Sequence, residues 1–202
     1  MAISPFKLSV PDEELSLLNQ KLKLARIPDL PESLADDNGL TGQSIRKLVD
    51  FWLNDFDWRK EEAELNKLPQ FPTPVDISDD FGPLDVHFVH SKSSKTNSTP
   101  LLFFHGWPGN FAEITKGLKR LNDEGFDVVA PSLPGYGFTA YPRKHGFDLS
   151  KVAEMGTKLM IKLGYQRFVA QGGDWGSMIV KLVAQDYPDN VMAVHAQLCI
   201  PR

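Results

Sequence analysis

Cysteine is nearly absent from this sequence, because Cys199 is the one cysteine among 202 residues. A single thiol cannot form an internal disulfide, so we expect a reducing compartment. A long apolar run is also missing. The N-terminal stretch MAISPFKLSVPDEELS has neither the apolar core of a signal peptide nor the length to span a bilayer. These absences predict a soluble, cytoplasmic protein without a membrane span.

Positive charge is not in excess either. The formal net charge is -4 and the pI is about 5.7, so nucleic acid and anionic membranes are not expected as partners. The sequence shows no metal-ligand spacing and no glycine-rich phosphate loop, and we therefore expect neither a metal nor another cofactor. A small molecule is the predicted partner, and self-association into a homo-oligomer is left open.

The residue composition and hydrophobic pattern of the chain change near residue 95. Residues 1–95 are rich in proline and charge, and apolar residues recur there with helical spacing in three short segments. These segments centre on Leu15 to Leu22, with a stop expected at Ile27, on Ser44 to Trp52 and on Asp57 to Leu68. We therefore predict a mostly helical N-terminal region.

Two further patterns close this region. The run LPQFPTPV, residues 68–75, holds three prolines and predicts an extended connector rather than a regular element. The alternating run LDVHFVH, residues 84–90, predicts a strand. We interpret His87 and His90 in that run as strand residues without a chemical role.

Beyond a polar loop at 91–100, short apolar runs alternate with helical patterns. Such alternation predicts an α/β fold, with a largely parallel sheet covered by helices on both faces. Strands are expected at 101–104, 126–131, 167–170 and 191–198, and helices at 110–122, 151–163 and 177–186.

The stretch QGGDWGSMI, residues 171–179, has the glycine spacing of a nucleophile elbow, a sharp strand-to-helix turn that exposes its central side chain. The central residue is Asp174. A carboxylate is already ionised at neutral pH, so it could attack carbon without a base to remove a proton. The residues expected to support this turn are Gly172, Gly173, Gly176 and Ser177.

The motif HGWPG, residues 105–109, directly follows the expected strand at 101–104. In hydrolases with an elbow, the loop at this place supplies one backbone N–H of an oxyanion hole, and the residue after the nucleophile supplies the other. These donors would be Trp107 and Trp175. His105 precedes the nucleophile and is interpreted as a structural hydrogen-bonding residue. The residues expected to support the loop are His105, Gly106 and Pro108.

HGWPG, PSLPGYGF and GGDWGS occur in this order on an α/β pattern, and the set resembles the epoxide hydrolases of the α/β-hydrolase superfamily. ARIPD, DWRKEEAELNKLPQF and LDVHFVH resemble the N-terminal extension of the microsomal-type branch. The resemblance implies such an extension at 1–95 and a partial α/β-hydrolase fold at 96–202. It also implies that Asp174 opens an epoxide to an alkyl ester, that water hydrolyses this ester to a vicinal diol, and that the role is detoxification.

The same resemblance implies a lid, a histidine base and an orienting acid that follow Asp174 in the chain. The one histidine that does so is His195, which we interpret as a packed residue of the strand VMAVHAQL. The lid would begin near Pro201. We therefore expect the isolated chain to be incomplete and inactive in turnover.

Two alternatives stay open. A haloalkane dehalogenase also uses an aspartate at the elbow, and both Trp107 and Trp175 are compatible with it, although the N-terminal region favours the epoxide branch. The other alternative is a truncated fragment without catalytic function.

Overall fold

The computed structural model describes residues 3–28, 41–78 and 80–198. Cys199 and Pro201, on which the expectations about the thiol and the lid depend, lie outside these residues. The chain forms two compact units, Leu8–Leu65 and a second unit that joins Met1–Lys7 to Asn66–Arg202. The domain boundary near residue 95 stays a prediction.

The first unit is helical, as predicted. Thr41 caps the start of the helix Gly42–Asn54, because the Thr41 hydroxyl accepts a hydrogen bond from the Ser44 amide at 3.0 Å. Two of its helices are linked by Arg59, which pairs with Asp12 and, at 2.7 Å, with Glu62. The helices are α1 (Asp12–Lys23), α3 (Gly42–Asn54) and α4 (Trp58–Leu65), so the first one ends before the expected stop at Ile27.

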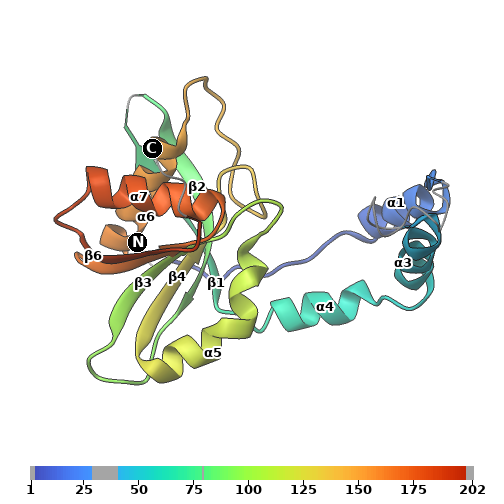
Figure 1. The fold of residues 1–202 in the computed structure, drawn as a ribbon, viewed down its shortest axis with the longest axis horizontal. Helices are drawn as coiled ribbons and strands as arrows, with labels where there is room; N and C mark the ends of the chain where they lie inside the picture. The colour runs from blue at the N-terminus through green and yellow to red at the C-terminus, as the bar shows by residue number, and fades with distance from the viewer. Residues whose placement is uncertain (1–2, 29–40, 79, 199–202) are drawn as a thin grey trace. The chain divides into compact units, whose positions relative to one another are not determined.

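The second unit contains a six-stranded sheet with the order β1-β2-β4-β3-β5-β6 (Figure 1). β1 and β2 pair antiparallel, β2 and β4 pair antiparallel, and β4, β3, β5 and β6 run parallel. The strands are β1 (Gln70–Ile77), β2 (Gly82–Ser91), β3 (Thr99–Phe104), β4 (Phe126–Pro131), β5 (Phe168–Gly172) and β6 (Val191–Ala196). The sheet is therefore largely parallel, as predicted.

The proline-rich run at 68–75 was predicted to be a connector, and this prediction is wrong. Most of it forms β1, which pairs with β2 along its whole length. β1 is an edge strand, and Pro72 and Pro74 are exposed while Thr73 and Val75 are buried. Proline lacks the N–H that a central strand needs for two neighbours, but an edge strand tolerates it where the missing N–H would face outward.

Helices cover both faces of the sheet, as predicted. On β3, Leu102 and Phe104 face α6, because a side chain added at Gly156 of that helix would contact both. The next side chain, Phe103, points to the opposite face and lies with Ala112 and other residues around α5. These helices are η2 (Phe111–Ile114), α5 (Thr115–Glu124), α6 (Leu149–Lys162) and α7 (Trp175–Asp186).

The register of β3 and β5 positions the candidate site. The two strands run parallel, and Phe104 pairs with Gly172 at the carboxyl end of both. The loop that follows β3 and the turn that follows β5 therefore leave the sheet side by side, at the edge where open α/β sheets bind ligands.

His195 lies on β6, so the predicted strand is confirmed, but its predicted packing is wrong. Its side chain is exposed, as are those of Met192 and Val194 on the same strand. Among the described strands, β6 pairs with β5 alone, and this leaves its outer edge open. No helix in the described part of the chain is long and apolar enough to cross a membrane.

Candidate active site

In the turn between β5 and α7, backbone segments cross in close contact with one another. Asp174 at its apex has φ 52° and ψ -123°, a conformation that strains a residue with a side chain by roughly 1–3 kcal/mol. The glycines on either side allow the crossing: a Cβ on Gly172 would lie 2.3 Å from the Gly176 carbonyl carbon, and a Cβ on Gly176 would lie 2.4 Å from the Phe104 oxygen. The sharp turn exposes the Asp174 side chain.

Ser177 ties this turn to the two neighbouring strand ends. Its buried hydroxyl donates to the Gly172 carbonyl oxygen at 2.9 Å and accepts from the Leu198 amide at 3.0 Å. Gly173 leaves room for the Gln197 side chain, whose amide oxygen would lie 2.6 Å from an added Cβ. The elbow is therefore fixed to the end of β5 and to the segment that follows β6.

The loop that follows β3 reaches the Asp174 carboxylate. The Trp107 amide donates to Asp174 Oδ1 at 2.8 Å, although the two residues lie 67 positions apart. The approach requires glycine at 106, since an added Cβ would lie 2.6 Å from Asp174 Cβ. The Gly109 amide closes the turn by donating to the Gly106 oxygen at 3.0 Å, across the Trp107–Pro108 cis peptide bond. An oxyanion-type donor and the candidate nucleophile are thus in direct contact.

The pKa of Asp174 is held below its usual value, first by the hydrogen bond from the Trp107 amide and then by that from the Trp175 amide. The carboxylate also stands at the N-terminus of α7, where the helix dipole favours negative charge. Asp174 is therefore ionised at neutral pH. The carboxylate is exposed and ionised, and the amide that binds Oδ1 leaves the other oxygen, Oδ2, able to act as a nucleophile.

His105 lies buried directly after β3. Its Nδ1 is 3.0 Å from the Gly106 oxygen, and its Nε2 is 3.0 Å from the Leu133 amide nitrogen. Burial lowers the pKa of the imidazole. Both ring nitrogens are occupied by backbone groups, so neither is free for proton transfer to a substrate.

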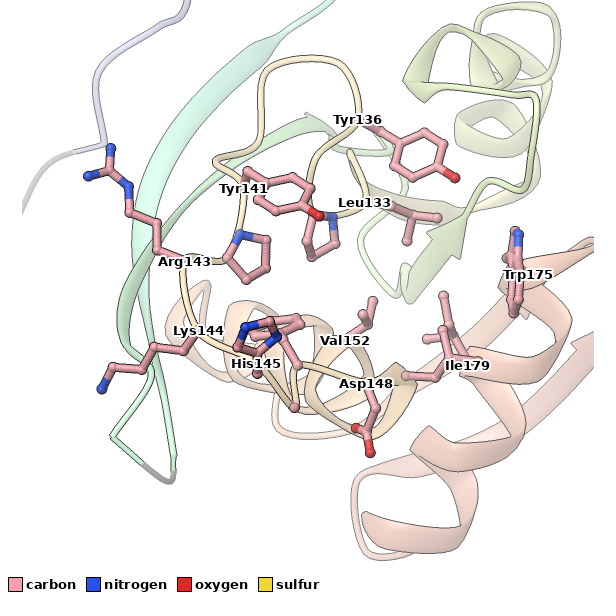
Figure 2. Close-up of a pocket in the computed structure, with 15 residues that line it drawn as sticks. Leu133, Tyr136, Tyr141, Arg143, Lys144, His145, Asp148, Val152, Trp175 and Ile179 are labelled. Carbon is pink, nitrogen blue, oxygen red and sulfur yellow. The ribbon is translucent and has the colours of Figure 1, made fainter.

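A cavity of about 860 Å³ borders the elbow (Figure 2). Trp175 and Ile179 of α7 form one side of it, and Leu133 and Tyr141 of the loop between β4 and α6 form another. A smaller hollow of about 380 Å³ contains Asp174 itself and is lined by Trp107, Pro108, Glu113 and Gln197. Asp174 therefore lines the smaller hollow, and the next residue in the chain, Trp175, lines the larger cavity.

The sequence indicated the residues that meet at Asp174 but not most of the residues that line the cavity and the smaller hollow. PSLPGYGF contributed to the family resemblance, and none of its residues was predicted to line the site, yet Leu133 and Tyr136 within it line the cavity. Glu113 and Gln197 carried no signal, because each is an isolated polar residue in its segment. His195 lines neither hollow. In the described part of the chain, no group of three His, Cys, Asp or Glu could hold a metal ion.

Two protein-family models match the chain. One is described as "Epoxide hydrolase N terminus" and matches residues 3–114. The other is described as "alpha/beta hydrolase fold" and matches residues 99–197, which include the elbow and the loop that follows β3.

Relatives and solved structures are similar over nearly the whole chain. "Epoxide hydrolase 1" of Sus scrofa is 37% identical, and "Juvenile hormone epoxide hydrolase 2" of Ctenocephalides felis is 35% identical; each comparison covers 98% of this chain. The structure of Aspergillus niger epoxide hydrolase has a TM-score of 0.88 at 36% identity and covers 100% of the chain, and that of the Bombyx mori juvenile hormone epoxide hydrolase has 0.86 at 27% and covers 98%. The chain spans 45% and 43% of the two relatives and 54% and 53% of the two structures, about half of each.

Proposed function

Because the chain belongs to the epoxide hydrolase family, we propose that Asp174 is the nucleophile of an epoxide-opening site and that Trp107 and Trp175 supply its oxyanion hole. The observation that carries the proposal is the hydrogen bond of 2.8 Å from the Trp107 amide to Asp174 Oδ1. It places a donor from one strand end on the carboxylate at another, as an oxyanion hole requires. Residues 1–95 are proposed as the N-terminal extension and residues 96–202 as the first part of the hydrolase core.

The first step is ring opening. Trp107 holds Oδ1, so Oδ2 attacks an epoxide carbon. As the new C–O bond forms, the ring C–O bond breaks and its electron pair goes to the ring oxygen, which then takes a proton from a general acid. Ring strain makes the carbon electrophilic, and the ionised carboxylate needs no base. The product is an alkyl ester of Asp174.

The second step is hydrolysis of this ester at the Asp174 carbonyl carbon. Water adds there and gives its proton to a base, and the carbonyl oxygen becomes an oxyanion between the Trp107 and Trp175 amides. Collapse of this intermediate breaks the bond between the carbonyl carbon and the former Oδ2, this oxygen takes the proton that the base received, and a vicinal diol leaves. The diol keeps Oδ2, and the oxygen of water stays on Asp174.

The part of the cavity next to the elbow supports an apolar epoxide as the substrate class, while Arg143, Lys144, His145 and Asp148 line another part. The cavity wall near the elbow consists of Trp175 and Ile179, and Leu133 and Val152 continue the apolar surface. An apolar substituent in this space would leave the oxirane near Asp174, since burial of such a group is favourable by roughly 25 cal/mol per Å². A cytoplasmic location and a detoxification role stay predictions.

The test is covalent labelling. The purified chain is incubated with a styrene-type epoxide and examined by peptide mass spectrometry. We expect one adduct per chain on the peptide that contains Asp174, and its absence in Asp174→Ala. Asp148→Asn is the matched control, because Asp148 is a second carboxylate near the elbow, in the wall of the larger cavity, and asparagine preserves the cap that this side chain provides to α6. This variant should label like the wild type.

The other outcomes each exclude something. Labelling that persists in Asp174→Ala would assign the nucleophile elsewhere. No labelling at all, with the fold intact by circular dichroism, would favour a chain without catalytic function. If a haloalkane alone formed the Asp174 ester and released halide, the site would be that of a dehalogenase.

A further inference from the structure

His105 occupies a special position under the loop that bears Trp107. It is 1% exposed, and both ring nitrogens contact backbone rather than side chains. One contact lies inside the loop that holds the oxyanion donor, at Gly106, and the other lies in the cavity wall, at Leu133. The ring thus joins two loops that leave the sheet at the same edge.

The partners determine the tautomer of this ring. The Gly106 carbonyl oxygen can only accept, so the Nδ1 that faces it at 3.0 Å carries the proton. The Leu133 amide can only donate, so the Nε2 that faces it at 3.0 Å is unprotonated. A charged imidazole would also carry a proton on Nε2, and this N–H would then face the N–H of Leu133 with no acceptor between the two donors. Neutral His105 is therefore the form that fits both loops.

The contact at Gly106 acts directly on the oxyanion donor, because the Gly106 carbonyl and the Trp107 N–H belong to one peptide unit. That unit is planar and trans, and its C=O and N–H point in opposite directions. Two donors hold the oxygen, His105 Nδ1 and the Gly109 amide, each at 3.0 Å. With the oxygen held, the N–H is directed away from the ring, toward Asp174 Oδ1 at 2.8 Å.

We infer that His105 is a positioning residue, which fixes the Gly106–Trp107 peptide so that its N–H points at the Asp174 carboxylate. Hydrogen bonds that a carbonyl accepts also polarise the peptide and strengthen its N–H as a donor. The inference rests on the proposed function in one respect: this N–H matters for catalysis only if Asp174 is the nucleophile.

The experiment reads the N–H directly, without an epoxide. Nitrogen-15 NMR follows the Trp107 amide across a pH titration, and carbon-13 NMR follows the Asp174 carboxyl. In the wild type the Trp107 amide should shift with the ionisation of Asp174. In His105→Phe this shift should shrink, and the titration midpoint of Asp174 should move up, toward that of an ordinary aspartate, because a stabilising donor is weakened.

His87→Phe is the matched control. His87 is also 1% exposed and also uses both ring nitrogens, at 2.9 Å from Ser132 Oγ and 3.0 Å from Gln70 Oε1, but neither bond touches Gly106. Loss of a buried imidazole is common to both variants. We expect His87→Phe to keep the Trp107 shift and the Asp174 midpoint of the wild type.

Three results would overturn the inference. The first is a folded His105→Phe variant in which the Trp107 amide shift and the Asp174 titration midpoint equal those of the wild type. The second is a change of these two quantities in His87→Phe that is as large as the change in His105→Phe. The third needs no variant: ring nitrogen-15 shifts in the wild type that place the proton of His105 on Nε2 would contradict the required tautomer. If the NMR result holds but Asp174 is never alkylated, positioning stands and the proposed nucleophile fails.

Discussion

Replacing Glu154 by glutamine removes a buried charge that joins α6 to the turn after β1. Glu154 is 4% exposed, and its carboxylate accepts from the Ser78 amide at 2.8 Å and the Ser78 hydroxyl at 2.7 Å. It also pairs with Lys158 at 2.6 Å and with Lys151 at 3.4 Å. Such a group stabilises the fold only as long as it is ionised and all its partners remain.

The magnitude follows from the pKa of Glu154. Burial alone would raise this pKa, but the hydrogen bonds from Lys158 and Ser78 outweigh burial and lower it from 4.5 to about 2. At ~1.4 kcal/mol per pKa unit, ionised Glu154 stabilises the folded state by about 3 kcal/mol. The folded pKa lies below the unfolded one, so this contribution is complete above about pH 5 and is lost as the pH falls toward 2.

Glu154→Gln should therefore lower the free energy of unfolding at pH 7 by about 2–3 kcal/mol. The side chain of Lys158 is 41% exposed and can regain water, which keeps the loss below that of a fully buried pair. The variant should also lose less stability than the wild type between pH 5 and pH 3. Urea unfolding followed by circular dichroism at these pH values measures both effects.

Glu124→Gln provides the control, because Glu124 is exposed near the end of α5 and should change stability by less than ~0.5 kcal/mol. A Glu154→Gln variant as stable as this control at pH 7 would refute the reasoning. So would equal acid sensitivity in Glu154→Gln and the wild type.

Three further substitutions test the elbow and its support. Asp174→Gly should remove the strain of φ 52° and raise the free energy of unfolding by about 1 kcal/mol, while it abolishes labelling; a drop in stability in urea would contradict this. Gly106→Ala would put a Cβ 2.6 Å from Asp174 Cβ, so labelling should slow by about tenfold or more in a folded protein. Gly156→Ala would put a Cβ 2.4 Å from Phe104 Cζ and should destabilise by about 1–3 kcal/mol, although alanine favours helices; a variant as stable as the wild type would show that Phe104 yields.

The sequence predicted those parts of the fold that depend on local pattern. Strand and helix alternation after residue 100 predicted a parallel sheet, in which the carboxyl ends of all strands lie at one edge. The sequence therefore predicted that Trp107 and Asp174 lie at the same edge, while the direct pairing of β3 with β5 came from the structure. The strand β1 was not, because Pro72 and Pro74 break a central strand but fit an edge strand, and the position of a strand in its sheet is not a local property.

Contacts between segments that are distant in the sequence could not be predicted either, because they too are not a local property. His105 was interpreted as a structural hydrogen-bonding residue, but its acceptor and donor lie one and 28 positions away, and no periodicity links Leu133 to it. The exposure of His195 also depends on what neighbours β6 rather than on the alternation of its own residues. Local pattern thus predicts elements and motif order, while partners across the sheet require coordinates.

An aspartate at this elbow changes what the two amides do during the proposed reaction. Before the reaction, the Trp107 and Trp175 amides already bind the ionised Asp174 carboxylate, and they lower its pKa. A carboxylate with a lower pKa is a somewhat weaker nucleophile, so the two amides do not speed ring opening by charge stabilisation. In the alkyl ester, Asp174 carries no negative charge. The charge returns to Oδ1, the oxygen that the amides bind, only when water adds to the carbonyl carbon. The amides therefore favour the second step over the first. A change that weakens the Trp107 donor should slow hydrolysis of the ester more than its formation, and pre-steady-state kinetics on a family member that turns over would detect this as accumulation of the alkyl-enzyme.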